Sequence, residues 1–483
     1  MLRLLLIRSA FLFLFFSIAV NLSAQLRIPG IFSNNMVLQR NKPVPVWGKA
    51  NPGTSITVTF QSQQKNTVAG ADSNWIITLD PLSTSATPST LTIKGNETIS
   101  FANVLVGDVW LCSGQSNMEY PLDRTLKRYA APKKGTDPSE AELKSSNKPD
   151  AIRYSYVERV LNQYPALPTK GWVNGNDTIV RYVSAIGYFF AKEIFEQTNV
   201  PIGIISTSWG GTRIEQWTPD WAYASSPIFK DSTVKPNYKI DGMHPGQMYK
   251  GMFEPLVPFA VKAVLWYQGE SNCMIEDQST YKEKFSIFIN AWRKVLKDET
   301  LPFYTVQISP YLYTARKDSK PHTPELLAEF WEVQTECTEL PNVHMVVTTD
   351  LVDNLKDIHP SYKWTVAHRL ALQALHNSYG QTKIEAYGPT YVSHKIKKNS
   401  IIVQFSHTGT GLASSDQQPL NWFTIAGADG VFVPATAVIR NNTVVVSAKE
   451  VKKPKQVRFA WNETAQPNFV NSEGLPALPF RTH

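Results

Sequence analysis

Short buried strands alternate with helices along the middle of the chain, and this alternation limits the possible folds more than any other feature. Apolar residues recur at helical spacing at Phe285, Phe288 and Trp292, and a further helix is expected near 326–336. Strands joined by helices form a parallel sheet with right-handed crossovers. The sequence therefore predicts an α/β domain over residues 106–384. Its strands are expected in the apolar runs at 109–112, 202–205, 263–266, 303–308 and 343–348.

The segments on either side of this domain have a different period. Apolar and polar residues alternate at 55–60 and again at 457–461, as in strands with one buried face. We expect a β-sandwich-like domain at 25–105 and a β-rich segment at 385–483, and one hypothesis is that the two pack together. Residues 120–180, rich in Lys, Pro, Asn and Asp, are predicted to be an insertion with little regular structure that shapes the site.

The first 24 residues have the features of a secretory signal peptide. Arg3 and Arg8 flank the start of an apolar stretch at 9–20, and small residues at 22–24 offer a cleavage site. The uncharged stretch is short for a bilayer span. We therefore expect export to the periplasm or the medium, with no stable membrane anchor after cleavage.

Composition excludes several other classes of protein. The net charge of +8 falls to +6 when two arginines leave with the signal peptide (8 − 2), and so small an excess does not indicate nucleic-acid binding. Three cysteines, Cys112, Cys273 and Cys337, are an odd number, and their apolar or motif context favours buried thiols over a disulfide framework. The sequence has no metal-ligand spacing, so we expect neither a metal nor a cofactor.

Polar motifs follow the predicted strands at 113–118 and 208–212, and others stand at 268–272 and 357–359. Because the carboxyl ends of parallel strands meet at one edge, these motifs are expected to converge. A serine hydroxyl such as that of Ser116 becomes a nucleophile when a base such as a histidine takes its proton. The alternative is that Ser116 only caps a helix.

The polar motifs are Gly114-Gln115-Ser116-Asn117-Met118, Ser208-Trp209-Gly210-Gly211-Thr212, Trp266-Tyr267-Gln268-Gly269-Glu270-Ser271-Asn272 and Asp357-Ile358-His359-Pro360. Together and in this order they resemble those of the sialate O-acetylesterase family within the SGNH hydrolases, and the similarity covers nearly the whole mature chain. The resemblance implies a flavodoxin-like three-layer α/β/α domain with β-rich flanks, a serine esterase mechanism without a metal, and removal of O-acetyl groups from sialic acids or related sugars.

The same resemblance assigns roles to individual residues. Ser116 is expected to be the nucleophile and His359 the general base. The oxyanion hole would combine the N–H groups of Ser116 and of Gly211, or alternatively Gly210, with the side chain of Gln268. Asn272 is the alternative amide donor.

The acid of the triad is less clearly marked. SGNH hydrolases generally place an aspartate three residues before the histidine, and here that position is Lys356. Asp357, Asp353 and Asp350 therefore compete, and a Ser–His dyad is the remaining alternative. Of these, Asp357 is our prediction.

Other functions are compatible with parts of the sequence. An acetyl esterase of plant-type polysaccharide such as xylan would use the same motifs. A glycoside hydrolase would need a carboxylate pair, such as Glu270 with Asp108 or Glu119. A non-catalytic glycan-binding protein would rely on the β segments and on aromatic side chains, of which the candidates are Trp209, Trp217, Trp266 and Tyr267.

Overall fold

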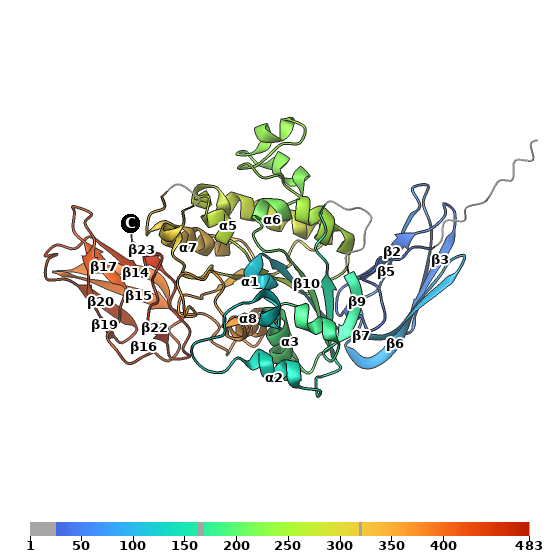
Figure 1. Cartoon of the computed structure of the whole chain (residues 1–483), viewed down its shortest axis with the longest axis horizontal. Helices are drawn as coiled ribbons and strands as arrows, with labels where there is room; N and C mark the ends of the chain where they lie inside the picture. The colour runs from blue at the N-terminus through green and yellow to red at the C-terminus, as the bar shows by residue number, and fades with distance from the viewer. Residues whose placement is uncertain (1–25, 162–168, 318–320, 483) are drawn as a thin grey trace, which may run out of the picture.

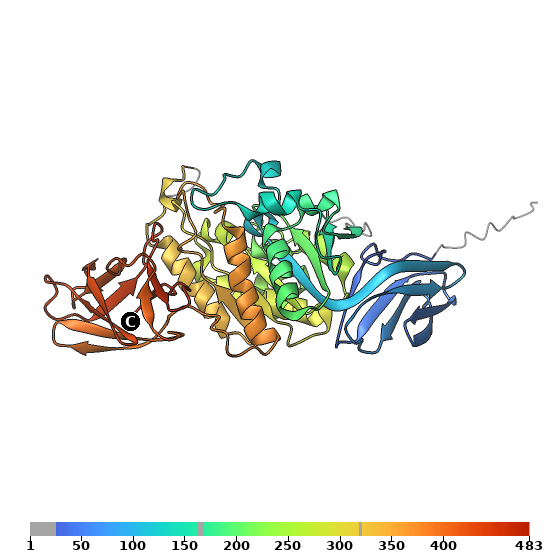
Figure 2. The same ribbon diagram turned by 90° about the horizontal axis from the view of Figure 1, so that it is seen from below.

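The computed structural model describes residues 26–161, 169–317 and 321–482, so the predicted signal peptide lies outside the described residues. A central α/β domain separates two β-rich modules, one at each end of an elongated molecule (Figure 1). The hypothesis that the two modules pack together is therefore wrong, since both views place them at opposite ends (Figure 2). Among the described helices, none has the length and apolar character of a bilayer span.

The central sheet has the strand order β13-β12-β11-β7-β10-β8-β9. Neighbouring strands are parallel, except that β9 runs antiparallel to β8. The parallel sheet predicted from the sequence is thus confirmed. The strands are β7 (Thr98–Gly114), β8 (Ile152–Val157), β9 (Thr169–Asn174), β10 (Ile202–Ser208), β11 (Ala263–Tyr267), β12 (Phe303–Val306) and β13 (Val343–Val346).

Strand β7 lies at the point where the direction of winding reverses. After β10 on one side of β7, the chain crosses to β11 on the other side and continues outward through β12 to β13. In open α/β sheets, ligands bind outside the carboxyl ends of the strands at this switch point. The end of β7 at Gly114 is therefore where a site is expected.

Helices cover both faces of the sheet and complete a three-layer α/β/α arrangement. Helices α3 (Ala185–Thr198) and α8 (Lys363–Ser378) lie on one face, and α6 (Tyr281–Leu296) and α7 (Leu326–Glu336) lie on the other (Figure 1). The apolar stripe of α6 is buried as its periodicity predicts, with the Trp292 ring 6.0 Å from that of Trp266 in β11. The predicted fold class is confirmed.

One predicted boundary and one predicted irregular region differ from the structure. Strand β7 runs without a break from Thr98 to Gly114, so the predicted division at 105/106 falls inside a strand. Its first part pairs with β6 and its second part with β10 and β11. The region 120–180 contains strand β8 of the central sheet, strand β9 and helix α2 (Pro138–Lys144), so it has more regular structure than its composition predicts.

The flanking modules consist of strands, as their alternation predicts. The closing segment is docked, because β23 (Phe480–Arg481) pairs with β21 (Gln456–Phe459). All three cysteines are buried and unpaired, as expected. The remaining strands are β1 (Val37–Gln39), β2 (Val44–Lys49), β3 (Ser55–Phe60), β4 (Gln63–Val68), β5 (Asn74–Leu79) and β6 (Ser85–Lys94), then β14 (Thr390–Lys397), β15 (Ser400–Ser406), β16 (Leu412–Ser414), β17 (Phe423–Ala426), β18 (Val433–Pro434), β19 (Thr436–Arg440), β20 (Thr443–Ser447) and β22 (Phe469–Asn471).

Candidate active site

Strand β7 ends in a tight turn that leads directly to Ser116. Gly114 has a φ of +138°, and a Cβ atom there would lie 2.2 Å from the backbone oxygen of Tyr267, so only glycine fits. Ser116 is the first residue of the short helix α1 (Ser116–Glu119), whose N-cap is Gln115. The interpretation of Ser116 as a helix cap is therefore wrong, and its half-buried hydroxyl remains available for chemistry.

The strands on either side bring two more motifs to this position. Gly114 pairs with Ser208 at the end of β10 and with Tyr267 at the end of β11. Just beyond β10, a Cβ atom on Gly210 would lie 3.1 Å from the Cβ of Ser116. The backbone at Gly210 thus lies directly against the candidate nucleophile, and a glycine there leaves the serine room.

Some backbone N–H groups near Ser116 already donate a hydrogen bond within the protein, and others do not. The N–H of Gly210 donates to Oε2 of Glu119 at 2.8 Å. Among the described residues, the N–H groups of Ser116 and Gly211 meet no backbone or side-chain acceptor, and Gly211 is exposed with a φ of +77°. Between the two glycines proposed from the sequence, the geometry favours Gly211 as an oxyanion donor.

The loop after β13 brings His359 to the same edge. The side chain of Asn117, next to Ser116, donates to the backbone oxygen of Ile358 at 3.0 Å. Nδ1 of His359 lies 3.4 Å from Oδ1 of Asp357, which also accepts the His359 backbone N–H at 2.9 Å. Burial alone would raise the pKa of Asp357, but its contacts with His359, with the backbone N–H and the nearby imidazole, outweigh burial and lower that pKa. A negative charge therefore stands beside the imidazole.

The two other aspartates considered for the triad have different partners. Asp353 accepts the hydroxyl of Tyr362 at 2.8 Å. Asp350 forms an ion pair with Arg369 at 2.6 Å. Of the three candidates, Asp357 is the one that the structure places against His359.

Gln268 is buried, and its amide is fully engaged. Its Nε2 lies 2.7 Å from Oδ1 of Asn272, 3.2 Å from Oε1 of Gln115 and 3.3 Å from the backbone oxygen of Thr212. Two hydrogens are thus shared among three acceptors. This geometry is at odds with an oxyanion role for Gln268, and instead makes it a link between three of the motifs.

Asn272 is also committed to the protein interior. Its Nδ2 donates to Glu215 at 3.1 Å and to Asp277 at 2.8 Å, so the alternative oxyanion role predicted for it is wrong in this geometry. Glu215, Asp277 and Asp241 place ligand atoms within 4.8 Å of one another, a spacing that suits a metal ion. The ammonium group of Lys284, in α6, contacts all three carboxylates and supplies the positive charge.

Replacing Lys284 with methionine is expected to destabilise the fold by about 3–5 kcal/mol, because the buried carboxylates of Glu215 and Asp277 lose the ammonium group that lies between them. Burial would lower the pKa of Lys284, but Glu215 and Asp277 raise it, so the lysine is charged. Urea unfolding followed by circular dichroism measures the effect. The matched control is Lys282→Met on the same helix, whose half-exposed ion pairs are worth less than about 1 kcal/mol. Equal effects of the two changes would contradict this assignment.

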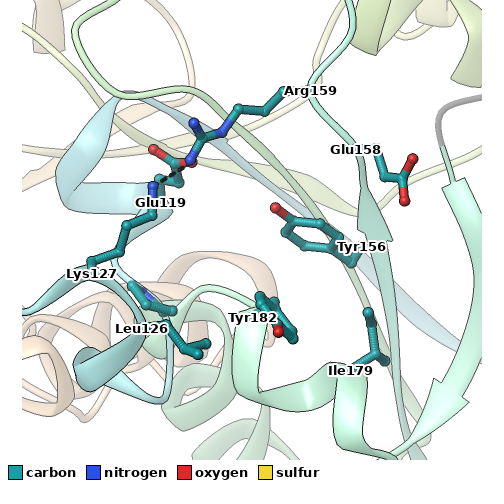
Figure 3. A pocket seen from close by; sticks show the side chains of 9 residues that line it. Glu119, Leu126, Lys127, Tyr156, Glu158, Arg159, Ile179 and Tyr182 are labelled. Carbon is teal, nitrogen blue, oxygen red and sulfur yellow. Dashed lines mark hydrogen bonds and ion pairs between the residues drawn. The ribbon is translucent and has the colours of Figure 1, made fainter.

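An open pocket of about 680 Å³ lies beside α1 (Figure 3). Glu119 forms ion pairs with Arg159 and with Lys127 at its wall, and the same carboxylate holds Gly210, which places this wall next to Ser116. The rings of Tyr156 and Tyr182, 6.3 Å apart, also line it and offer apolar faces for a sugar. The other lining residues are Pro121, Leu126, Glu158 and Ile179.

Most of the aromatic residues that were proposed from the sequence to bind a glycan lie in the hydrophobic core. Trp217, Trp266 and Tyr267 are fully buried. Trp209 is partly buried, with the guanidinium of Arg159 5.7 Å from its ring. Sequence reasoning missed the pocket tyrosines because Tyr156 lies in the region predicted to be irregular and Tyr182 lies just beyond it.

Two buried polar residues beside the site were also missed. Asn117 follows Ser116, and Lys363 stands four residues after His359 at the start of α8. Lys363 shares the apolar stripe of this helix with Val366 and Leu370, at three- and seven-residue spacing. A lysine on an apolar stripe was the available signal of a buried charge.

The carboxylate pair required by a glycoside hydrolase is not formed by the predicted partners. Asp108 lies at the other end of the central part of β7, where Arg40 pairs with it at 2.9 Å. The negative charge of Glu119 is balanced by its ion pairs with Lys127 and Arg159. Glu270 accepts instead from Asn117 at 2.5 Å.

A parallel α/β sheet with a serine at its switch point, and a histidine–aspartate pair on the facing loop, defines a hydrolase of the esterase class. Residues 106–376 match the family model described as carbohydrate esterase, sialic acid-specific acetylesterase. The chain belongs to this family of carbohydrate esterases.

Individual relatives agree with this assignment. The human sialate O-acetylesterase is 28% identical over 397 residues, covering 75% of this chain and 73% of the relative. The rat sialate O-acetylesterase is 29% identical over 422 residues, covering 75% of each chain. The crystal structure of a carbohydrate acetylesterase from Xanthomonas citri is similar along most of its length, with a TM-score of 0.82, 32% identity, and coverage of 95% of this chain and 100% of that one.

Proposed function

We propose that the chain is an exported serine esterase that removes O-acetyl groups from sialic acids or related sugars through an acyl-enzyme. The observation that carries this proposal is the hydrogen bond from Asn117 to the backbone oxygen of Ile358. It joins the immediate neighbours of Ser116 and His359, residues far apart in the sequence. Acyl transfer needs a hydroxyl and an imidazole close together, and this hydrogen bond holds the two segments that carry them side by side.

The reaction proceeds in two halves. His359 takes the proton of the Ser116 hydroxyl as its oxygen attacks the acetyl carbon, and Asp357 stabilises the resulting imidazolium. The N–H groups of Ser116 and Gly211 donate to the oxyanion of the tetrahedral intermediate. The imidazolium then protonates the departing sugar oxygen, which leaves an acetyl-serine. Water, activated by the same histidine, attacks this ester and releases acetate.

A second substrate class is favoured by the charge of the pocket. Arg159 and Lys127 both pair with Glu119, and Glu158 also lines the wall, so these four side chains have no net charge. A sialic acid carries a carboxylate that such a wall does not attract strongly. A neutral acetylated plant polysaccharide such as xylan is therefore the alternative substrate, with the same catalytic residues.

Acetate release separates these functions. The mature protein is incubated with an O-acetylated sialic acid and with acetylated xylan, and acetate and new reducing ends are measured. The proposal predicts acetate from the sialic acid substrate, and no new reducing ends. A clear preference for xylan selects the alternative substrate. Reducing ends produced by the protein and retained in Ser116→Ala would establish a glycoside hydrolase and overturn the proposal.

Export is proposed from the first 24 residues alone. Their positive start, apolar stretch and small residues before position 25 are those of a signal peptide. Expression in a Gram-negative host, followed by fractionation and N-terminal sequencing, is expected to recover a protein that begins at Gln25 outside the cytoplasm. A cytoplasmic protein with an intact start would contradict export.

A further inference from the structure

Three buried polar side chains connect the segments around Ser116, Glu270 and His359. Nδ2 of Asn117 lies 2.5 Å from Oε1 of Glu270, and Nζ of Lys363 lies 2.8 Å from Oδ1 of Asn117. All three side chains are almost completely buried. A continuous line of hydrogen bonds therefore runs from the residue after Ser116 to the start of α8.

These side chains also hold the backbone on both sides of His359. Asn117 donates to the oxygen of Ile358 at 3.0 Å, and Lys363 donates to the oxygen of Pro360 at 2.5 Å. His359 itself lies between these two anchored peptide groups. Two contacts that do not involve its own ring thus help to hold His359 in place relative to Ser116.

Burying Lys363 and Glu270 costs free energy. Apolar side chains at these positions would stabilise the fold more, if packing were their only role. Burial lowers the pKa of Lys363 to about 7 and raises the pKa of Glu270. Replacing a buried ionic group by an apolar one of similar size is often neutral or stabilising when the whole network is replaced. The rings of Tyr120 and Tyr267, 4.7 Å and 5.8 Å from the Lys363 ammonium, add stabilising contacts there.

We propose that Asn117, Lys363 and Glu270 form a positioning network that sets His359 against Ser116. The inference rests on the proposed serine esterase function. The network does not contact the substrate: it acts through the two peptide groups that flank the histidine. A displacement of His359 by about 1 Å would be enough to lower the rate about 100-fold.

Lys363→Met tests the network, because methionine fills a similar volume without donating hydrogen bonds. We expect kcat for acetate release to fall about 100-fold while KM changes less than about threefold. The rate at which a fluorophosphonate probe labels Ser116 is expected to fall in parallel, because this labelling also needs the general base. A purely structural lysine would change thermal stability without changing either rate.

Gln373→Met is the matched control on the same helix. Gln373 is as buried as Lys363, and its Nε2 donates to the backbone oxygen of Met345 at 2.7 Å, away from the motifs. It is expected to lose stability and keep kcat. If Lys363→Met does not fold, Asn117→Leu is measured in its place, with the same expected loss.

The outcomes separate the two proposals. A folded Lys363→Met or Asn117→Leu variant with kcat within threefold of the wild type would overturn the positioning network while Ser116→Ala remains inactive. If Ser116→Ala keeps its activity, the serine mechanism itself is wrong, and the network falls with it. A parallel loss in Lys363→Met and in probe labelling, with Gln373→Met active, supports the network.

Discussion

Replacing Ser116 with alanine is expected to lower kcat for acetate release by about 10⁴- to 10⁶-fold, the range seen when a serine nucleophile is removed. The hydroxyl is the only group lost, and its oxygen is the atom that attacks the acetyl carbon in the proposed mechanism. Ser116 stands at the first position of α1 without a capping bond. The free energy of unfolding should therefore change by less than about 0.5 kcal/mol. Acetate release and thermal unfolding, measured on one preparation, give both values.

Ser113→Ala is the matched control for this change. Ser113 lies three residues earlier in β7 and is completely buried. Its loss is expected to leave kcat within about threefold of the wild type. Retention of a tenth or more of the activity in Ser116→Ala would exclude it as the nucleophile.

Replacing His359 with alanine is expected to lower kcat by about 10³-fold or more, because Ser116 then lacks the base that takes its proton. Asp357→Asn is expected to have a smaller effect, about 10²-fold. A triad aspartate hydrogen-bonded to its histidine contributes about 10⁴-fold, and the distance of 3.4 Å between Asp357 and His359 is longer than a hydrogen bond. Rates of acetate release at saturating substrate measure both.

Asp353→Asn distinguishes Asp357, the predicted triad acid, from the alternative acid Asp353. Asp353 is engaged by Tyr362, so this change is expected to leave kcat within about threefold. A large loss in Asp353→Asn combined with an active Asp357→Asn would reassign the acid. Full activity in both would indicate a Ser–His dyad.

Much of the fold follows from local patterns in the sequence. The apolar stripe of α6 and the cap of α3, where Ser184 accepts the N–H of Gly187 at 3.2 Å, depend on residues close together in the chain. The predicted helix near 326–336 is α7, for the same reason. Strand β8 could not be recognised from the sequence, because it lies in a polar region and its neighbours on the sheet are what bury it. Pairing with β10 over Ile152–Tyr156 makes this segment a strand.

Within the candidate site, the sequence predicted where Ser116 and His359 lie, while their catalytic roles stay predictions. It failed for groups whose role depends on their hydrogen-bond partners. Ser116 and His359 are at one sheet edge, as their positions after strands predict. Gln268 and Asn272 were expected to be open donors because an amide can donate. The structure engages both, one among three acceptors and the other with two carboxylates.

The sequence by itself determined the parallel sheet, the motifs that meet at its edge and the identity of the candidate nucleophile and base. The sheet and the place of the motifs depend on hydrophobic period, which a single chain displays locally. The candidate nucleophile and base come from the resemblance of these motifs to a known family. Only the tertiary structure decided which carboxylate lies beside His359, which N–H groups near Ser116 are open, and that Lys363 is buried against Asn117. Those properties depend on distances between residues up to 246 positions apart, and only folding brings such residues together.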